Sequence, residues 1–427
     1  MAQTSAVIEV SRKDPNGPSY SYTIEDAVKG FDYSSDALTV GEECHIEVVN
    51  ERGRMTPFLN PGDSVQISLR NADVNGGAPT VRHRGVISVR KAGSRAGTIS
   101  IVSCDLGWHL MNNSAPLWFN LRRGSLPQLA DTTRDKPLIS PTFGLEGVRF
   151  ENVTNKSLKQ GVAVARALSQ TVTDPIFAVQ AEPGESIYDI LSRYAQRVNA
   201  LVNVSVDGYL QFFNPDYTAT PSYKFVCRLD GVGNNVEDGE MLESLATRYT
   251  AVEAVGERIQ YGEPNDPTNP NATKTRGAFY SPGLLPFLHA MTFGDGESYS
   301  PDIAKKMARW RYSRGLYESW YVRYTVPEHH QGGVWFESDT MCEVEDEVLG
   351  IYGLFYVASV HCESSRGNEG DRTTLILRLP GLLSASYGVW KTPPVIRQDK
   401  AAQQVYAAVA STDQTQTTTT ANQSVPR

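Results

Sequence analysis

The sequence predicts a β-rich α+β protein with several domains, and three observations support that fold class. The chain has 427 residues, more than one ordinary hydrophobic core requires, which suggests two to four domains. Short segments that alternate apolar and polar residues recur near both ends of the chain, separated by Gly, Asn, Asp and Pro. Between them, apolar residues recur at helical spacing. We therefore expect two strand-rich regions flanking a helix-containing middle.

Residues 1–105 are expected to form the first strand-rich region, either alone or completed by later segments. Its strands are predicted from HIEVVNERG, DSVQISLRN, RGVISVRKAG and GTISIVSCD, and Pro61, Gly62 and Asp63 predict a turn before the second. Evenly spaced antiparallel strands are typical of a barrel or a sandwich. A local basic cluster is expected to solvate an edge hairpin rather than to bind phosphate. It comprises Arg82, Arg84, Arg90, Lys91 and Arg95.

Residues 106–245 form the expected middle region. GSLPQLADTTR predicts a short helix, and a strand is expected at Val148 to Phe150. The clearest pattern is the helix-hairpin module of residues 181–216, where Ser186 and Asp189 resemble a capping box. One apolar helix stripe follows, and Asp207-Gly208 then predicts a tight turn between two strands. The stripe comprises Ile187, Ile190, Leu191, Tyr194 and Val198.

Residues 246–385 form the second strand-rich region. The polar segment 262–277 predicts a surface loop, and Pro301 to Arg314 predicts a helix that leads into further strands. Residues 386–427 form an extended, low-complexity tail. A free chain of that composition is expected to be disordered, so an ordered tail would need a partner chain.

Net charge, hydropathy and cysteine content exclude several classes of function. Forty Lys and Arg residues against 48 Asp and Glu residues give a formal net charge of −8, which argues against a dedicated nucleic-acid binder. The N-terminal residues lack the apolar core of a signal peptide, and no window is apolar enough for a membrane span, so folding in a cytoplasm is expected. The five scattered cysteines predict reduced thiols rather than a disulfide framework.

The sequence contains none of the common motifs for nucleotide, zinc or hydrolase chemistry, so we expect no enzyme activity, no metal and no cofactor. His329 and His330 are adjacent, and neighbouring strand residues point to opposite faces, so a structural or solvated role is favoured over a shared metal. The carboxylates of ESDTMCEVEDEV alternate as on a solvated strand face. A pair flanking a sugar cleft remains the glycosidase alternative.

An aromatic cluster in the second region is interpreted as core plus subunit contact, because Tyr and Trp are enriched at interfaces. Glycan binding or base stacking is the alternative. The interface candidates are Trp310, Tyr312, Tyr317, Trp320, Tyr324 and, further on, Trp390.

The order of these features resembles the late control protein D family, the baseplate hub proteins of contractile-tailed bacteriophages. PGDSVQISL and RGVISV come first, then CDLGWHLMNNSAP, and then the helix-hairpin module. VEDEVLGIYGLFYVASV and GDRTTLILRLP complete the order. The resemblance covers roughly Glu42 to Gly381. The segment 263–277 and the Thr/Gln-rich tail depart from the family pattern.

The resemblance implies a homotrimer in which each chain carries two tail-tube-like antiparallel β-barrel domains. Three chains would then form a pseudo-sixfold ring between the hexameric tail tube, or its initiator, and the trimeric central spike. Implied further partners are baseplate wedge proteins, the tape measure protein and DNA passing through the lumen. The implied location is the virion tail baseplate, after assembly in the host cytoplasm. Open alternatives are a peptidoglycan-binding or cell-wall-degrading tail protein and a related contractile injection particle. The hub interpretation predicts that Tyr194, Phe212 and Phe213 are packed, whereas glycan binding predicts an exposed aromatic groove.

Overall fold

The computed structural model describes residues 4–12, 19–55, 57–93, 97–114, 120–121, 147–151, 179–180, 183–197, 200–256, 276–280, 285–295, 301–365 and 370–383. The described helices are α1 (Trp108–Asn112), α4 (Ile187–Arg197) and α5 (Pro301–Ser319). None of the helices in this part of the chain is long and apolar enough to cross a membrane.

The strands fall into three stretches of the sequence. The first comprises β1 (Ser5–Arg12), β2 (Tyr20–Ile24), β3 (Val28–Asp36), β4 (Glu43–Val49), β5 (Ser64–Arg70), β6 (Thr80–Ala92) and β7 (Thr98–Asp105). The second comprises β8 (Asn120–Leu121), β9 (Gly147–Glu151), β10 (Val179–Gln180), β11 (Leu201–Val204), β12 (Tyr209–Phe213), β13 (Tyr223–Cys227), β14 (Asp238–Glu243), β15 (Ala251–Gly256), β16 (Arg276–Tyr280) and β17 (Ala290–Asp295). The third comprises β18 (Trp320–Pro327), β19 (His330–Gln331), β20 (Val334–Trp335), β21 (Thr340–Asp346), β22 (Ile351–Ser365) and β23 (Gly370–Arg378).

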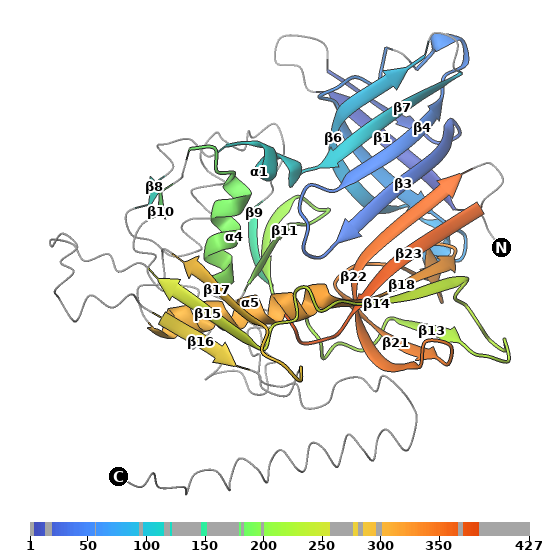
Figure 1. Ribbon diagram of the computed structural model, residues 1–427. Coiled ribbons are helices and arrows are strands. Elements are labelled where there is room, and N and C mark those ends of the chain that lie inside the picture. Colours follow the sequence, from blue (N-terminus) through green and yellow to red (C-terminus); the bar gives the residue numbers. More distant parts are fainter. Residues whose placement is uncertain are drawn as a thin grey trace, which may run out of the picture.

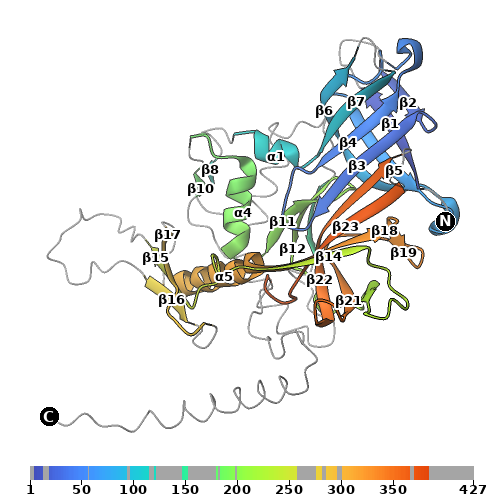
Figure 2. The same cartoon turned by 45° about the vertical axis from the view of Figure 1, so that its right-hand side comes forward.

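Thirteen strands from both ends of the chain form one sheet. Its main path runs β14-β18-β23-β22-β3-β4-β7-β6-β5-β1-β2, while β21 pairs with β22 and β13 pairs with β21. Figures 1 and 2 show the N-terminal strands, blue to cyan, lying directly beside β22 and β23. Alternate residues of β1 and β5 enter one large hydrophobic core, which Trp320, Tyr324 and Phe355 of the later strands also enter. The predicted alternation is therefore confirmed, in a sheet that spans both strand-rich regions.

Two smaller layers lie beside this sheet (Figure 1). In one, β11, β12 and β9 form a three-stranded sheet near α4; in the other, β16, β15 and β17 pack on α5. The second contact is very close, because a Cβ added to Gly277 of β16 would lie 2.0 Å from the backbone nitrogen of Lys305. Only glycine allows that approach.

Several expected elements agree with the structure and others differ. The strand expected at Val148 to Phe150 is confirmed as β9, and the helix expected to end at Arg314 continues to Ser319. The loop expected over 262–277 differs at its end, because Arg276 already begins β16. The helix expected in GSLPQLADTTR, most of that loop and the tail lie outside the described residues.

The division expected at residue 245 does not follow the sheets. The strands β13 and β14, placed by sequence in the middle region, pair with β21 and β18. Pairing between segments about a hundred residues apart leaves no local signal, so composition alone could not assign these strands. In the basic cluster, Arg82 and Arg84 lie where β6 pairs with β5, whereas Arg90 and Lys91 lie where β6 pairs only with β7, so this part of the β6–β7 hairpin has a free edge, as expected. Arg95 lies outside the described residues.

Candidate functional site

The junction between the two ends of the chain is built on β22, which changes its partner along its length. Residues Ile351–Val357 pair with β21, whereas Ser359–Ser365 pair with β3. The change coincides with a register shift against β23 between Val357 and Ser359. Such a bulge bends a strand and redirects its edge. The bulge residue Ala358 accepts a hydrogen bond from the backbone nitrogen of Ala37 at 2.9 Å.

A buried apolar group, here called the central cluster, surrounds this bulge. It consists of Ala37, Leu201, Phe213, Tyr317, Met341, Tyr356, Ala358, Leu382 and Leu383. These residues come from the end of β3, the helix-hairpin module, α5, β21, β22 and the segment after β23. Tyr356 also donates a hydrogen bond to Asp339 at 2.9 Å, and its ring contacts Tyr217 edge-on. The large sheet, the helix-hairpin module and α5 therefore meet at this point.

The helix-hairpin module has the local structure that its sequence predicts. Ser186 Oγ accepts a hydrogen bond from the backbone nitrogen of Asp189, whose carboxylate accepts one in return from the Ser186 nitrogen. This is the reciprocal capping box. Phe212 and Phe213 are buried, as the hub interpretation predicts, so this pair offers no surface on which a sugar could stack. The side chain of Tyr194 lies outside the described residues.

Polar contacts also join the two ends of the chain. Arg82 of β6 is buried and forms an ion pair with Glu337, and its guanidinium lies 5.5 Å from the ring centroid of Trp335 in β20. The backbone nitrogen of Thr4 donates to Asp371 at 2.9 Å. Ser35 and Ser338, 303 residues apart, share a hydrogen bond of 2.7 Å between their hydroxyls. These contacts place the β19–β20 hairpin firmly against the N-terminal strands.

The adjacent histidines are both buried, so the structural interpretation holds and the solvated one does not. His329 Nδ1 lies 2.8 Å from Thr373 Oγ1, and that hydroxyl itself donates to the Glu328 carbonyl. His329 therefore donates from Nδ1, and its Nε2 faces Asp371 at 3.8 Å. Burial lowers the pKa of His329 to about 4. The neutral ring thus packs between β23 and the turn at Glu328, and its hydrogen bond to Thr373 joins them.

The predicted interface residues are mostly core in this chain. Tyr312, Tyr317, Trp320 and Tyr324 are buried, whereas Trp310 is half-buried. Trp390 lies outside the described residues. Tyr324 donates to the buried carboxylate of Asp346 at 2.6 Å, while Glu343 and Glu345 of the same strand keep solvent contact, as the alternating pattern predicts. The four buried rings thus favour the core part of the core-or-contact interpretation.

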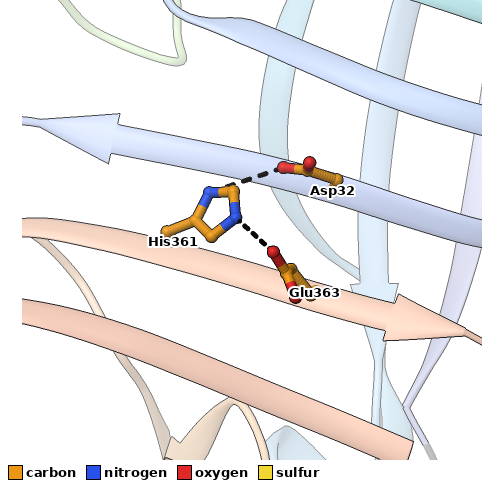
Figure 3. Close-up of side chains that lie close together, drawn as sticks. All are labelled: Asp32, His361 and Glu363. Carbon is orange, nitrogen blue, oxygen red and sulfur yellow. Dashed lines mark hydrogen bonds and ion pairs between the residues drawn. The ribbon is translucent and has the colours of Figure 1, made fainter. Parts of the chain in front are cut away.

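One group of side chains that sequence reasoning missed lies across the junction (Figure 3). His361 and Glu363 of β22 and Asp32 of β3 bring potential metal-ligand atoms within 4.8 Å of one another. This is the only such group found among the described residues. Alternation marks His361 and Glu363 as neighbours on one strand face, but nothing local in the sequence connects them to Asp32. The five cysteines are all unpaired and four are buried, and none of them belongs to this group.

Comparisons with known proteins identify the fold. The sequence matches no protein-family model, and no curated protein matches it. The tail protein from Neisseria meningitidis MC58 aligns with a TM-score of 0.66 over 89% of this chain and 98% of that one, at 17% identity. The 43 kDa tail protein of prophage MuSo2 from Shewanella oneidensis aligns with a TM-score of 0.61 over 88% and 98%, at 15% identity.

A chain of the Francisella PdpA-VgrG complex gives a TM-score of 0.53 at 9% identity. The alignment covers 88% of this chain and 58% of that one. The chain therefore has a β-rich fold of the phage tail protein type.

Proposed function

We propose that the protein is a structural component of a bacteriophage tail, the trimeric baseplate hub of the late control protein D type. The observation that carries this proposal is the fold likeness to the Neisseria tail protein over nearly the whole of both chains. In this proposal the N-terminal strands and the C-terminal strands form two barrel-like units. Three chains then present six such units to the hexameric tail tube and three-fold symmetry to the central spike. We assign the chain no catalytic role.

The junction supports a mechanical role. A shared strand, a buried apolar cluster and the Arg82–Glu337 ion pair couple the two ends of the chain. Buried packing of this kind resists relative motion because close-packed interiors deform little. A hub must keep a fixed spacing between its units while the tail delivers DNA. The proposed partners are the spike, the tube or its initiator, wedge proteins and the tape measure protein, within the virion.

Exposed apolar side chains support contacts with other chains. Leu229 and Val232, in the connection between β13 and β14, are 78% and 63% exposed. Val348 of the neighbouring β21–β22 turn is also exposed, and the backbone nitrogen of Leu229 donates to Glu347 at 2.9 Å. Apolar groups gathered on a surface are typical of interaction sites. Trp310 and Trp390 remain further candidates for subunit contact.

The test is the mass and shape of the purified full-length protein, alone and co-expressed with the spike protein. We expect light scattering to give the mass of three chains, and negative-stain images to show rings that bind the spike. Leu229→Asp combined with Val232→Asp is expected to lower the trimer fraction, whereas Val89→Asp, at a similarly exposed position on β6, is not. A chain that stays monomeric and never binds the spike contradicts the proposal. Hydrolysis of purified cell wall would favour the degrading alternative instead.

A further inference from the structure

The three side chains across the junction share one face of the sheet because of strand geometry. His361 and Glu363 are two residues apart on β22, so both point to the same side. Glu363 is the direct register partner of Asp32 on β3. Asp32 and Glu363 are therefore opposed carboxylates, and His361 lies diagonally from Asp32 along the same face.

The distances are those of a compact ligand set. His361 Nε2 lies 2.8 Å from Glu363 Oε1, and Nδ1 lies 3.4 Å from Asp32 Oδ1. Figure 3 shows the imidazole between the two carboxylates. An imidazole binds a metal through one nitrogen, so the ring must turn to present that nitrogen to an ion held by both acids. Side-chain exposures of 35% for His361, 43% for Asp32 and 58% for Glu363 leave room for this rotation.

The surroundings favour a cation at this position. The face carries two directly opposed carboxylates, and like charges in that arrangement destabilise a strand pair. The cross-strand neighbour of Glu363 on β23 is Arg372, whose guanidinium lies 3.5 Å from Glu237. The cross-strand neighbour of Asp32 on β4 is His45, which lies 3.7 Å from Glu43. Both of these cross-strand basic side chains thus have acidic partners elsewhere.

We propose that Asp32, His361 and Glu363 bind one divalent transition-metal ion of the zinc type, and that this ion links β3 to β22. Zinc accepts imidazole nitrogen and carboxylate oxygen as ligands, and a site with three protein ligands keeps water in the fourth position. Imidazole disfavours calcium and magnesium, which prefer oxygen ligands. The site spans the seam at which the two ends of the chain pair, so its occupancy strengthens that pairing.

Isothermal titration of chelator-treated, full-length protein with ZnCl2 tests the site. We expect one tight equivalent per chain for Zn²⁺ and none for MgCl2 or CaCl2. His361→Ala and Asp32→Asn are each expected to weaken this binding at least tenfold, while circular dichroism confirms that both variants fold. The matched control is His45→Ala, which removes another exposed imidazole from the same face and should leave the affinity unchanged.

Hydrogen exchange tests the link between the strands. Zn²⁺ is expected to slow exchange of the backbone amides that pair β3 with β22 in the wild type and to have no such effect in His361→Ala. Absence of a tight equivalent in the wild type overturns the proposal. Equal binding by wild type and His361→Ala, or an equal loss in His45→Ala, also overturns it, because the ion would then bind elsewhere or to any surface imidazole.

Discussion

The backbone nitrogen of Ala37 donates a hydrogen bond to the carbonyl oxygen of Ala358, at the residue where β22 leaves β21 and joins β3. Both side chains are buried, at 1% and 2% exposure. The two small residues let the end of β3, α5 and the helix-hairpin module converge on the bulge. A larger side chain at either position is therefore expected to displace the end of β3, α5 and the helix-hairpin module together.

Ala358→Leu is expected to lower the free energy of unfolding by about 1–3 kcal/mol, the usual cost of overpacking a filled core. The check is urea denaturation followed by circular dichroism. Val348→Leu, at a position 60% exposed, serves as the control and should be nearly neutral. A stable Ala358→Leu variant would mean that the central cluster has unfilled space.

Arg82 and Glu337 are expected to interact by about 1 kcal/mol in a double-mutant cycle. The value stays modest because the Glu337 side chain is 54% exposed and solvent screens the pair. Arg82→Ala alone is expected to lower the free energy of unfolding more than Glu337→Ala does, since it also removes the contact with Trp335. Equal single-variant losses, measured by denaturant unfolding, would contradict this ranking.

His83 is expected to make stability depend on pH between about 4 and 6.5. Burial lowers the pKa of His83 to about 4 from its ordinary value of 6.5. In that window the unfolded chain binds more protons than the native one, so stability falls as the pH falls from 6.5 towards 4. His329 acts in the same direction. Burial raises the pKa of Asp105 to about 6, which acts in the opposite direction.

Because these effects oppose one another, the measurement compares variants. His83→Gln is expected to reduce the slope of unfolding free energy against pH by up to about 1.4 kcal/mol per pH unit, which corresponds to one proton. His45→Gln, on an exposed side chain, is the control. An unchanged slope in His83→Gln would show that this ring is protonated in the native protein.

Gly277→Ala is expected to destabilise the β16–α5 contact by at least about 1–3 kcal/mol, since the new methyl would meet the backbone of α5 at 2.0 Å. Gly294→Ala in β17 of the same sheet is the matched control, because an added Cβ there has no neighbour within 4 Å. Thermal unfolding of both variants compares them directly. Similar melting temperatures would imply that α5 can move away from β16.

Local signals account for the parts of the fold that the sequence predicted. The capping pair Ser186 and Asp189, the Asp207-Gly208 turn and the alternation within individual strands each depend on residues only a few positions apart. Helix α5 outlasts its predicted end at Arg314 for a non-local reason. Arg378 of β23 donates to the carbonyl of Tyr317 in the last turn and to that of Trp320, where β18 begins, so the helix end is satisfied from outside the helix.

The junction could not be predicted because its partners are distant in sequence. Nothing near Asp32 indicates that it will face Glu363, and nothing near Arg82 indicates Glu337. The role of the aromatic residues could not be predicted from the sequence either. Trp320 and Tyr324 lie on one strand face, which sequence can predict, but whether that face meets this chain or another one depends on the whole sheet. Composition therefore predicted the fold class, while the site required the topology.

The pairing of β3 with β22 also has a consequence for synthesis. A ribosome releases β3 more than 300 residues before its partner in β22 exists. At about 5–20 residues per second, that edge waits on the order of tens of seconds. Until then β3 presents unpaired backbone groups that another nascent chain could capture. On polysomes, where several ribosomes translate one message and several nascent chains lie close together, chaperone binding to the β3 edge would therefore matter most.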